Sequence, residues 1–138
     1  MNTSNNSDYA ALLLRVALGV MFLAHGLTKV FVFTIPGTVG FFAQLGFPGW
    51  LAYLVILGEV GGGILLVLGV YTRWVALANI VILLGSIPVH WANGWMFANQ
   101  GGGWEYPVFL IIASLAVALL GSGTFAYHPP WIKAQAVG

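Results

Sequence analysis

Residues 50–71 read Trp50-Leu-Ala-Tyr-Leu-Val-Ile-Leu-Gly-Glu59-Val-Gly-Gly-Gly-Ile-Leu-Leu-Val-Leu-Gly-Val-Tyr71. Glu59 is the only charged residue in this apolar run. As a helix with a rise of about 1.5 Å per residue, the run is about 30 Å long, which is enough to cross a bilayer. A carboxylate at the centre of a bilayer costs at least ~2.5 kcal/mol on insertion scales, so Glu59 should face a protein partner or a wet cavity.

The composition of the whole chain indicates an integral membrane protein in contact with the lipid bilayer. Of its 138 residues, 60% are hydrophobic and 5% are charged, whereas a soluble domain carries about 25% charged residues. The net charge of +1, with no basic cluster, argues against a nucleic-acid partner. Because cysteine is absent, the chain contains no thiol nucleophile, thiolate metal site or iron–sulfur cluster of its own.

Apolar runs bounded by helix-start and helix-stop residues predict four membrane helices, at about residues 9–33, 50–71, 73–91 and 105–121. Ser7 or Asp8 is placed to cap the first helix, and Thr72 to cap the third. Residues 34–49 are rich in glycine, proline and phenylalanine, and we expect a connection that lies in the interface or re-enters the membrane. The prediction is an all-α integral membrane four-helix bundle over residues 10–123, between a polar tail (1–9) and a C-terminal tail (124–138).

The few charges near the helix ends predict the orientation. With four crossings, Arg73 and Lys133 fall on the side of the N-terminus, and the positive-inside rule makes that side cytoplasmic for both termini. The glycine- and tryptophan-rich loop at residues 92–104 then faces outward. Tryptophans at that level would form an aromatic belt: Trp50, Trp91, Trp95 and Trp104.

Arg15 is the best available partner for Glu59, because its long side chain lies on the inward stripe of the first helix. Such a pair could be a structural ion pair that fixes helix register, or part of a functional site. In the second case we expect Glu59 to form the floor of an outward-facing pocket.

Four further polar residues lie toward the outer ends of the helices and are our candidates for direct ligand contact: His25, Lys29, His90 and Glu105. Each also has a simpler interpretation. Lys29 could snorkel to the interface, His90 could be an interfacial residue, and Glu105 could be a favourable charge at a helix start. No residue is assigned a catalytic role.

Three stretches resemble the DoxX family: Leu13-Leu-Arg15-Val-Ala-Leu-Gly19-Val-Met-Phe-Leu-Ala-His25-Gly26-Leu-Thr-Lys29, Gly58-Glu59-Val-Gly-Gly-Gly63 with Leu68-Gly-Val-Tyr-Thr72-Arg73, and Gly102-Gly-Trp-Glu105-Tyr-Pro107. The resemblance extends from about residue 10 to Gly123, after which Thr124-Phe-Ala-Tyr-His128 departs from the Ser/Asp stretch common in the family. It implies a four-helix protein of the bacterial inner (cytoplasmic) membrane. The family is named from the small subunit of a thiosulfate:quinone oxidoreductase, and other members are associated with quinones, catechols or oxidative stress.

The leading hypothesis is therefore a quinone-linked redox subunit that works with a partner. Histidine, lysine and carboxylate groups could supply the hydrogen bonds and the proton route that a quinone headgroup needs. The candidate quinone-binding residues are His25, Lys29, Glu59, His90 and Glu105. No covalently bound cofactor is expected, and no flavin or nicotinamide motif is recognisable, so electrons would come from a partner subunit or a small donor. Whether the chain is itself an enzyme, as a quinone-reducing subunit, stays open.

Three other hypotheses remain. The chain could be a transporter or binding protein for a small molecule, or a structural subunit of a membrane complex. As a weaker alternative, His25 and His90 could ligate a metal or haem from two helices. The sequence leaves homo-oligomer formation open.

Overall fold

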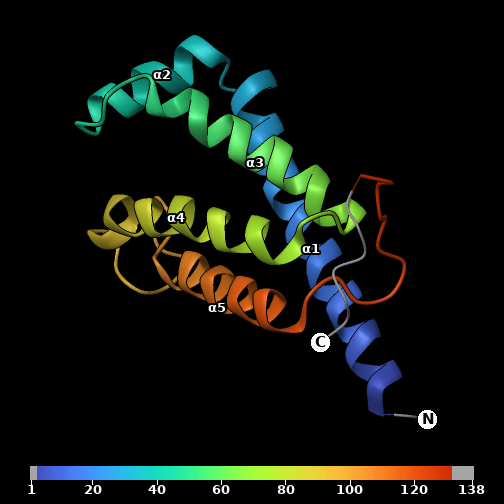
Figure 1. Cartoon of the computed structure of the whole chain (residues 1–138). Helices are drawn as coiled ribbons and strands as arrows, with labels where there is room; N and C mark the ends of the chain where they lie inside the picture. Colours follow the sequence, from blue (N-terminus) through green and yellow to red (C-terminus); the bar gives the residue numbers. More distant parts are fainter. Residues whose placement is uncertain (1–2, 132–138) are drawn as a thin grey trace.

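The computed structural model describes residues 3–131, and all regular secondary structure in this part of the chain is helical (Figure 1). The all-α prediction is thus confirmed. Lys133, on which the predicted orientation partly depends, lies outside the described residues. Five helices follow one another: α1 (Thr3–Phe31), α2 (Ile35–Gln44), α3 (Leu51–Leu68), α4 (Thr72–Trp91) and α5 (Glu105–Leu120).

Three helices are long and apolar enough to cross a bilayer: α1 from Asn5 to Phe31, α3 and α4. Helix α5 is also apolar, but its 16 residues give it a length of only about 24 Å. The bounds of α3, α4 and α5 agree with the predicted helices to within three residues. The chain is therefore a membrane protein with several spanning helices.

Two predicted helix caps were wrong. Helix α1 begins at Thr3, so Ser7 and Asp8 lie inside it, and most of the predicted polar tail is helical. Helix α4 is preceded by Tyr71 in a left-handed conformation with φ of 49°, and Thr72 is already helical. The Thr72 hydroxyl instead accepts a hydrogen bond from the Ser122 hydroxyl at 3.0 Å.

The predicted connection over residues 34–49 contains a helix of its own, α2. The Thr34 hydroxyl caps its start by accepting a hydrogen bond from the Gly37 N–H at 3.2 Å, and Pro36 occupies the first turn, where its missing N–H has no helical partner to lose. Phe41 remains exposed on α2. In Figure 1 this short helix lies beside the beginning of α3, away from α4 and α5.

Helices α1 and α3 make the closest helix pair, and glycines on both allow the approach. A Cβ at Gly63 would lie 2.7 Å from the Leu23 amide nitrogen, and one at Gly19 would lie 2.8 Å from the Gly63 carbonyl oxygen. Real side chains do not tolerate such distances to backbone atoms. The face of α3 around Gly62 and Gly63 is therefore buried, as small residues allow in membrane helix pairs.

Arg15 pairs with backbone carbonyls rather than with Glu59, so the predicted Arg15–Glu59 ion pair was wrong. The guanidinium is 1% exposed and donates to the carbonyls of Leu66 (3.0 Å) and Val67 (2.6 Å) in the last turn of α3. It also donates to the carbonyls of Ser122 (2.7 Å) and Thr124 (3.0 Å).

This arrangement uses four of the five N–H donors of Arg15 and explains why it needs no carboxylate. The Leu66 carbonyl also accepts the Gly69 N–H at 3.1 Å. The last turn of α3 carries the negative end of the helix dipole, so its carbonyls suit a cation. Arg15 therefore links the segment after α5 to the middle of α1 and to the end of α3.

Candidate functional site

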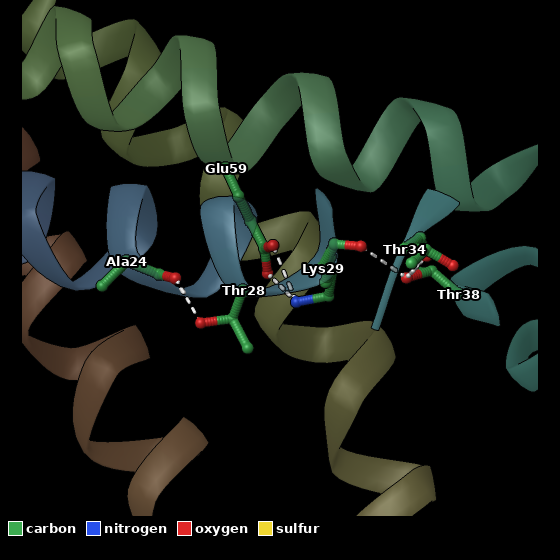
Figure 2. A network of polar contacts seen from close by, with 6 residues as sticks. All are labelled: Ala24, Thr28, Lys29, Thr34, Thr38 and Glu59. Atoms are coloured by element: carbon green, nitrogen blue, oxygen red, sulfur yellow. Dashed lines mark hydrogen bonds and ion pairs between the residues drawn. The ribbon is translucent and has the colours of Figure 1, made fainter. Parts of the chain in front are cut away.

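Lys29 of α1 and Glu59 of α3 form a largely buried ion pair. Lys29 Nζ lies 2.7 Å from Glu59 Oε2 and 2.9 Å from Oε1, so both carboxylate oxygens are engaged (Figure 2). The Glu59 side chain is 7% exposed and the Lys29 side chain 21%. A Cβ at Gly26, one turn before Lys29, would lie 3.0 Å from Glu59 Cβ, so only a residue without a side chain lets α3 come this close.

Helix α2 closes the Lys29 end of the pair. The buried Thr38 hydroxyl donates to the Lys29 carbonyl at 3.0 Å and to the Thr34 carbonyl at 2.9 Å (Figure 2). These contacts join the end of α1 to the start of α2. The short helix therefore helps hold Lys29 in register with Glu59.

A cavity of about 450 Å³ lies where α1 and α4 end and α5 begins. Two of the predicted ligand residues, His25 and His90, line it from α1 and from the end of α4. Tyr106, in the first turn of α5, has its ring 6.2 Å from the ring of His25. The remaining lining residues are Phe97, Gly101, Gly102, Gly103 and Pro107.

The orientation of His90 is set by the loop at residues 92–104. Its Nδ1 lies 3.2 Å from the Gly101 carbonyl oxygen and 3.1 Å from that of Gly102. Because both neighbours are acceptors, Nδ1 must carry a proton. A neutral His90 ring therefore keeps its Nε2 as a free acceptor.

The loop that covers the cavity is a tightly bonded structure. The Asn93 side-chain amide donates to the carbonyls of Gly101 (3.1 Å) and Gly102 (2.9 Å), and the Trp104 ring stacks on Trp91 at 4.9 Å. A Cβ at Gly103 would clash with the carbonyl oxygens of Trp95 and Met96, so no other residue fits there. The loop presents fixed carbonyls and rings to the cavity.

Glu105 faces the loop and does not line the His25–His90 cavity. Its Oε1 accepts a hydrogen bond from the Phe97 N–H at 2.6 Å, while its own N–H donates to the Trp95 carbonyl at 3.0 Å. A carboxylate at a helix start also suits the helix dipole. Glu105 thereby holds Phe97 in place beside the cavity.

The predicted candidates thus divide into three groups. His25 and His90 share the cavity, Lys29 and Glu59 pair with each other outside its lining, and Glu105 fixes the loop. Sequence reasoning missed Tyr106 as a cavity residue. Its position directly after Glu105, at the start of a helix level with His25 and His90, was the available signal.

No group of three or more His, Cys, Asp or Glu side chains that could hold a metal occurs within residues 3–131. The two-histidine alternative requires only His25 and His90, which line the same cavity. It stays a prediction that a visible absorption spectrum can test.

Comparison with known proteins shows the class to which this helical membrane fold belongs. The family model described as DoxX matches residues 10–92, and the chain belongs to the DoxX family. The predicted resemblance is thereby confirmed.

Among individual relatives, a Bacillus subtilis (strain 168) protein named "Putative oxidoreductase CatD" is 32% identical over 131 residues, which cover 95% of this chain and 93% of CatD. Two proteins of Escherichia coli (strain K12) match shorter stretches. "Inner membrane protein YphA" is 35% identical over 62% of this chain and 66% of its own length. "Inner membrane protein YqjF" is 34% identical over 51% and 52%. No solved structure matches the chain with significance.

Proposed function

We propose that this protein is a quinone-linked redox subunit of a bacterial cytoplasmic membrane. In this proposal α1, α3, α4 and α5 cross the bilayer, both termini are cytoplasmic, and the loop at residues 92–104 lies outside. The apolar character of these four helices supports the crossings, and the names of YphA and YqjF support the compartment. The name of CatD supports a redox role.

The observation that carries the proposal is the cavity between His25, His90 and Tyr106. Its volume of about 450 Å³ is within the range of small-molecule sites, about 300–1,000 Å³. Apolar walls contribute flat rings from Phe97 and Tyr106, and the polar groups are few. A planar ring with two carbonyl groups suits such a lining.

The cavity offers a hydrogen-bond donor, Tyr106, for the oxidised quinone and an acceptor, His90, for the reduced quinol. Tyr106 donates only to the Met21 sulfur, at 3.5 Å, and sulfur is a weak acceptor, so a ligand carbonyl can take this proton instead. Neutral His90 offers Nε2, which can accept the hydroxyl of a quinol. A quinone becomes a quinol by gaining two electrons and two protons, and His25 and His90 are suited to pass the protons.

The electrons must come from a donor that the proposal names by class. The chain has no cysteine, so its own thiols cannot supply them. We assign that role to a redox partner subunit or to a small reduced molecule. The Lys29–Glu59 pair then holds α1 against α3 and so positions His25, one helical turn before Lys29.

A titration of purified protein in lipid nanodiscs tests the site. The probe is 2,3-dimethoxy-5-methyl-benzoquinone, read out by quenching of tryptophan fluorescence. Loss of one ordinary hydrogen bond should weaken binding about threefold to tenfold in His25→Ala and in His90→Ala. The matched control is His128→Ala, since His128 is exposed and lies outside the cavity. Equal affinity in all three variants would overturn the assignment.

A transporter or solute-binding protein could use the same cavity, and a structural subunit could use only the Lys29–Glu59 pair. Flux of a solute into proteoliposomes, abolished by His90→Ala, would favour the first. Loss of complex assembly in Glu59→Gln, with the activity of the remaining complex unchanged, would favour the second.

A further inference from the structure

A second cavity, of about 480 Å³, adjoins the His25–His90 cavity. The two cavities share Phe97 and Tyr106, whose rings are 5.7 Å apart and tilted by 57°. These two rings therefore form a common wall. The other lining residues of the second cavity are Trp95, Glu105, Val108, Phe109 and Ile112.

The second cavity differs from the first in chemistry. Its only charged group, Glu105, already accepts the Phe97 N–H at 2.6 Å, and every other lining residue is apolar or aromatic. Phe109 and Ile112 are 65% and 60% exposed on the outer face of α5. In a membrane-spanning helix that face meets hydrocarbon, so the cavity is a groove that opens toward lipid. We call it the α5 groove.

We infer that the α5 groove binds the apolar tail of the same ligand whose ring occupies the His25–His90 cavity. This inference rests on the proposed function. The shared wall carries it, because a ligand that extends past Phe97 and Tyr106 leaves the cavity that holds the two histidines and enters one lined by apolar and aromatic side chains beside Glu105. The favoured ligand is thus an amphipathic ring with an alkyl or isoprenoid tail, and it reaches the site sideways from the bilayer.

The inference also gives Glu105 a role as a positioning residue. By holding the Phe97 backbone, it fixes one side of the passage between ring cavity and groove. In this inference Glu105 acts on the ligand only through Phe97, and we assign it no part in the redox reaction.

The test compares two quinones with the same ring in nanodiscs of one lipid composition: one without a tail and one with a decyl tail. The variant is Ile112→Trp, which fills the groove. The matched control is Leu119→Trp, since Leu119 is 80% exposed on α5 and does not line the groove. The decyl quinone partitions into lipid to the same extent in both samples. This partition therefore cancels when its dissociation constant for Ile112→Trp is divided by that for Leu119→Trp.

Blocking the groove should weaken binding of the decyl quinone severalfold relative to Leu119→Trp, because the tail then loses its packing contacts with the groove walls. The tail-free quinone should bind equally well to Ile112→Trp and Leu119→Trp. Equal binding of the decyl quinone to both variants would overturn the tail site but leave the ring site standing. Absence of binding by either quinone to the unmodified protein would overturn the proposed function as well.

Other occupants of the groove give distinct results. If a second copy of the chain covers it, Ile112→Trp lowers crosslinking between copies and leaves the decyl advantage intact. If a membrane phospholipid covers it, Ile112→Trp lowers the amount of co-purified lipid, again with the decyl advantage intact. Either result would overturn the inference.

Discussion

Lys29 Nζ lies within 2.9 Å of both carboxylate oxygens of Glu59, which joins the end of α1 to the middle of α3. Both charges are largely withdrawn from the surface, Glu59 more than Lys29. Removing one partner of a buried pair leaves an uncompensated charge, whereas removing both does not. The pair therefore makes a prediction that depends on which partner is lost.

Lys29→Met should destabilise the protein more than Glu59→Gln does. A lone Glu59 stays buried, at a cost of about 3–5 kcal/mol, whereas a lone Lys29 can extend toward the interface. The double variant Lys29→Met/Glu59→Gln should recover most of the loss. Thermal unfolding in one detergent, arranged as a double-mutant cycle, measures this. Additive effects in the double variant would show that the pair is not coupled.

Arg15→Lys should destabilise the protein even though it keeps the charge. A lysine ammonium cannot reproduce the planar fork that reaches four carbonyls on two segments, and hydrogen bonds to charged groups contribute about 1.5–3 kcal/mol each. We expect a loss of about 3 kcal/mol and faster proteolytic cleavage within residues 121–131.

Arg73→Lys is the matched control for this substitution, because Arg73 is exposed. It should change stability by less than about 0.5 kcal/mol. Similar melting temperatures for Arg15→Lys and Arg73→Lys would refute this structural role of Arg15.

Gly63→Ala and Gly61→Ala should have opposite effects although both lie in α3. At Gly63 the new methyl would press on the Leu23 backbone, and such overpacking costs about 1–3 kcal/mol. At Gly61 nothing lies within 4 Å, so alanine should be neutral or stabilise the helix by up to about 1 kcal/mol. Comparing the melting temperatures of Gly63→Ala and Gly61→Ala with that of the unmodified protein tests this prediction. A stable Gly63→Ala would mean that α1 and α3 pack less closely.

Glu105→Ala should loosen the loop, whereas Glu105→Gln should largely preserve it. The glutamine carbonyl can still accept the Phe97 N–H, but alanine leaves that donor unpaired. Hydrogen exchange at the Phe97 amide should accelerate about tenfold in Glu105→Ala, equivalent to about 1.4 kcal/mol, and far less in Glu105→Gln. Equal exchange in both variants would contradict this role for Glu105.

The apolar runs made most of the fold predictable. Long apolar segments of this kind satisfy their backbone hydrogen bonds in a bilayer as helices, and these runs with their helix-start and helix-stop residues located α3, α4 and α5. Helix α2 was missed because its two glycines and its proline are typical of loops. The Thr34 cap and the contacts of Thr38 with the end of α1 outweigh those local preferences, and such contacts are visible only in three dimensions.

The partner of Glu59 was not predictable from helix periodicity. Arg15 and Lys29 lie on the same stripe of α1, so the sequence offered two cations for one acid. The choice depends on where α1 and α3 cross, and on the carbonyls in the last turn of α3 that accept hydrogen bonds from Arg15 instead. His25 and His90 were easier to bring together, because both lie near the C-terminal ends of α1 and α4, which run in the same direction in a four-crossing topology.

The central claim is that a quinone ring binds between His25, His90 and Tyr106, and photolabelling tests it most directly. An azidoquinone is irradiated with the protein in nanodiscs, and the labelled peptides are mapped by mass spectrometry with and without excess unlabelled quinone. The account predicts labels that the unlabelled quinone removes, on His25 and within residues 90–107. Labels spread over the lipid-exposed helix faces and unaffected by competitor would contradict it.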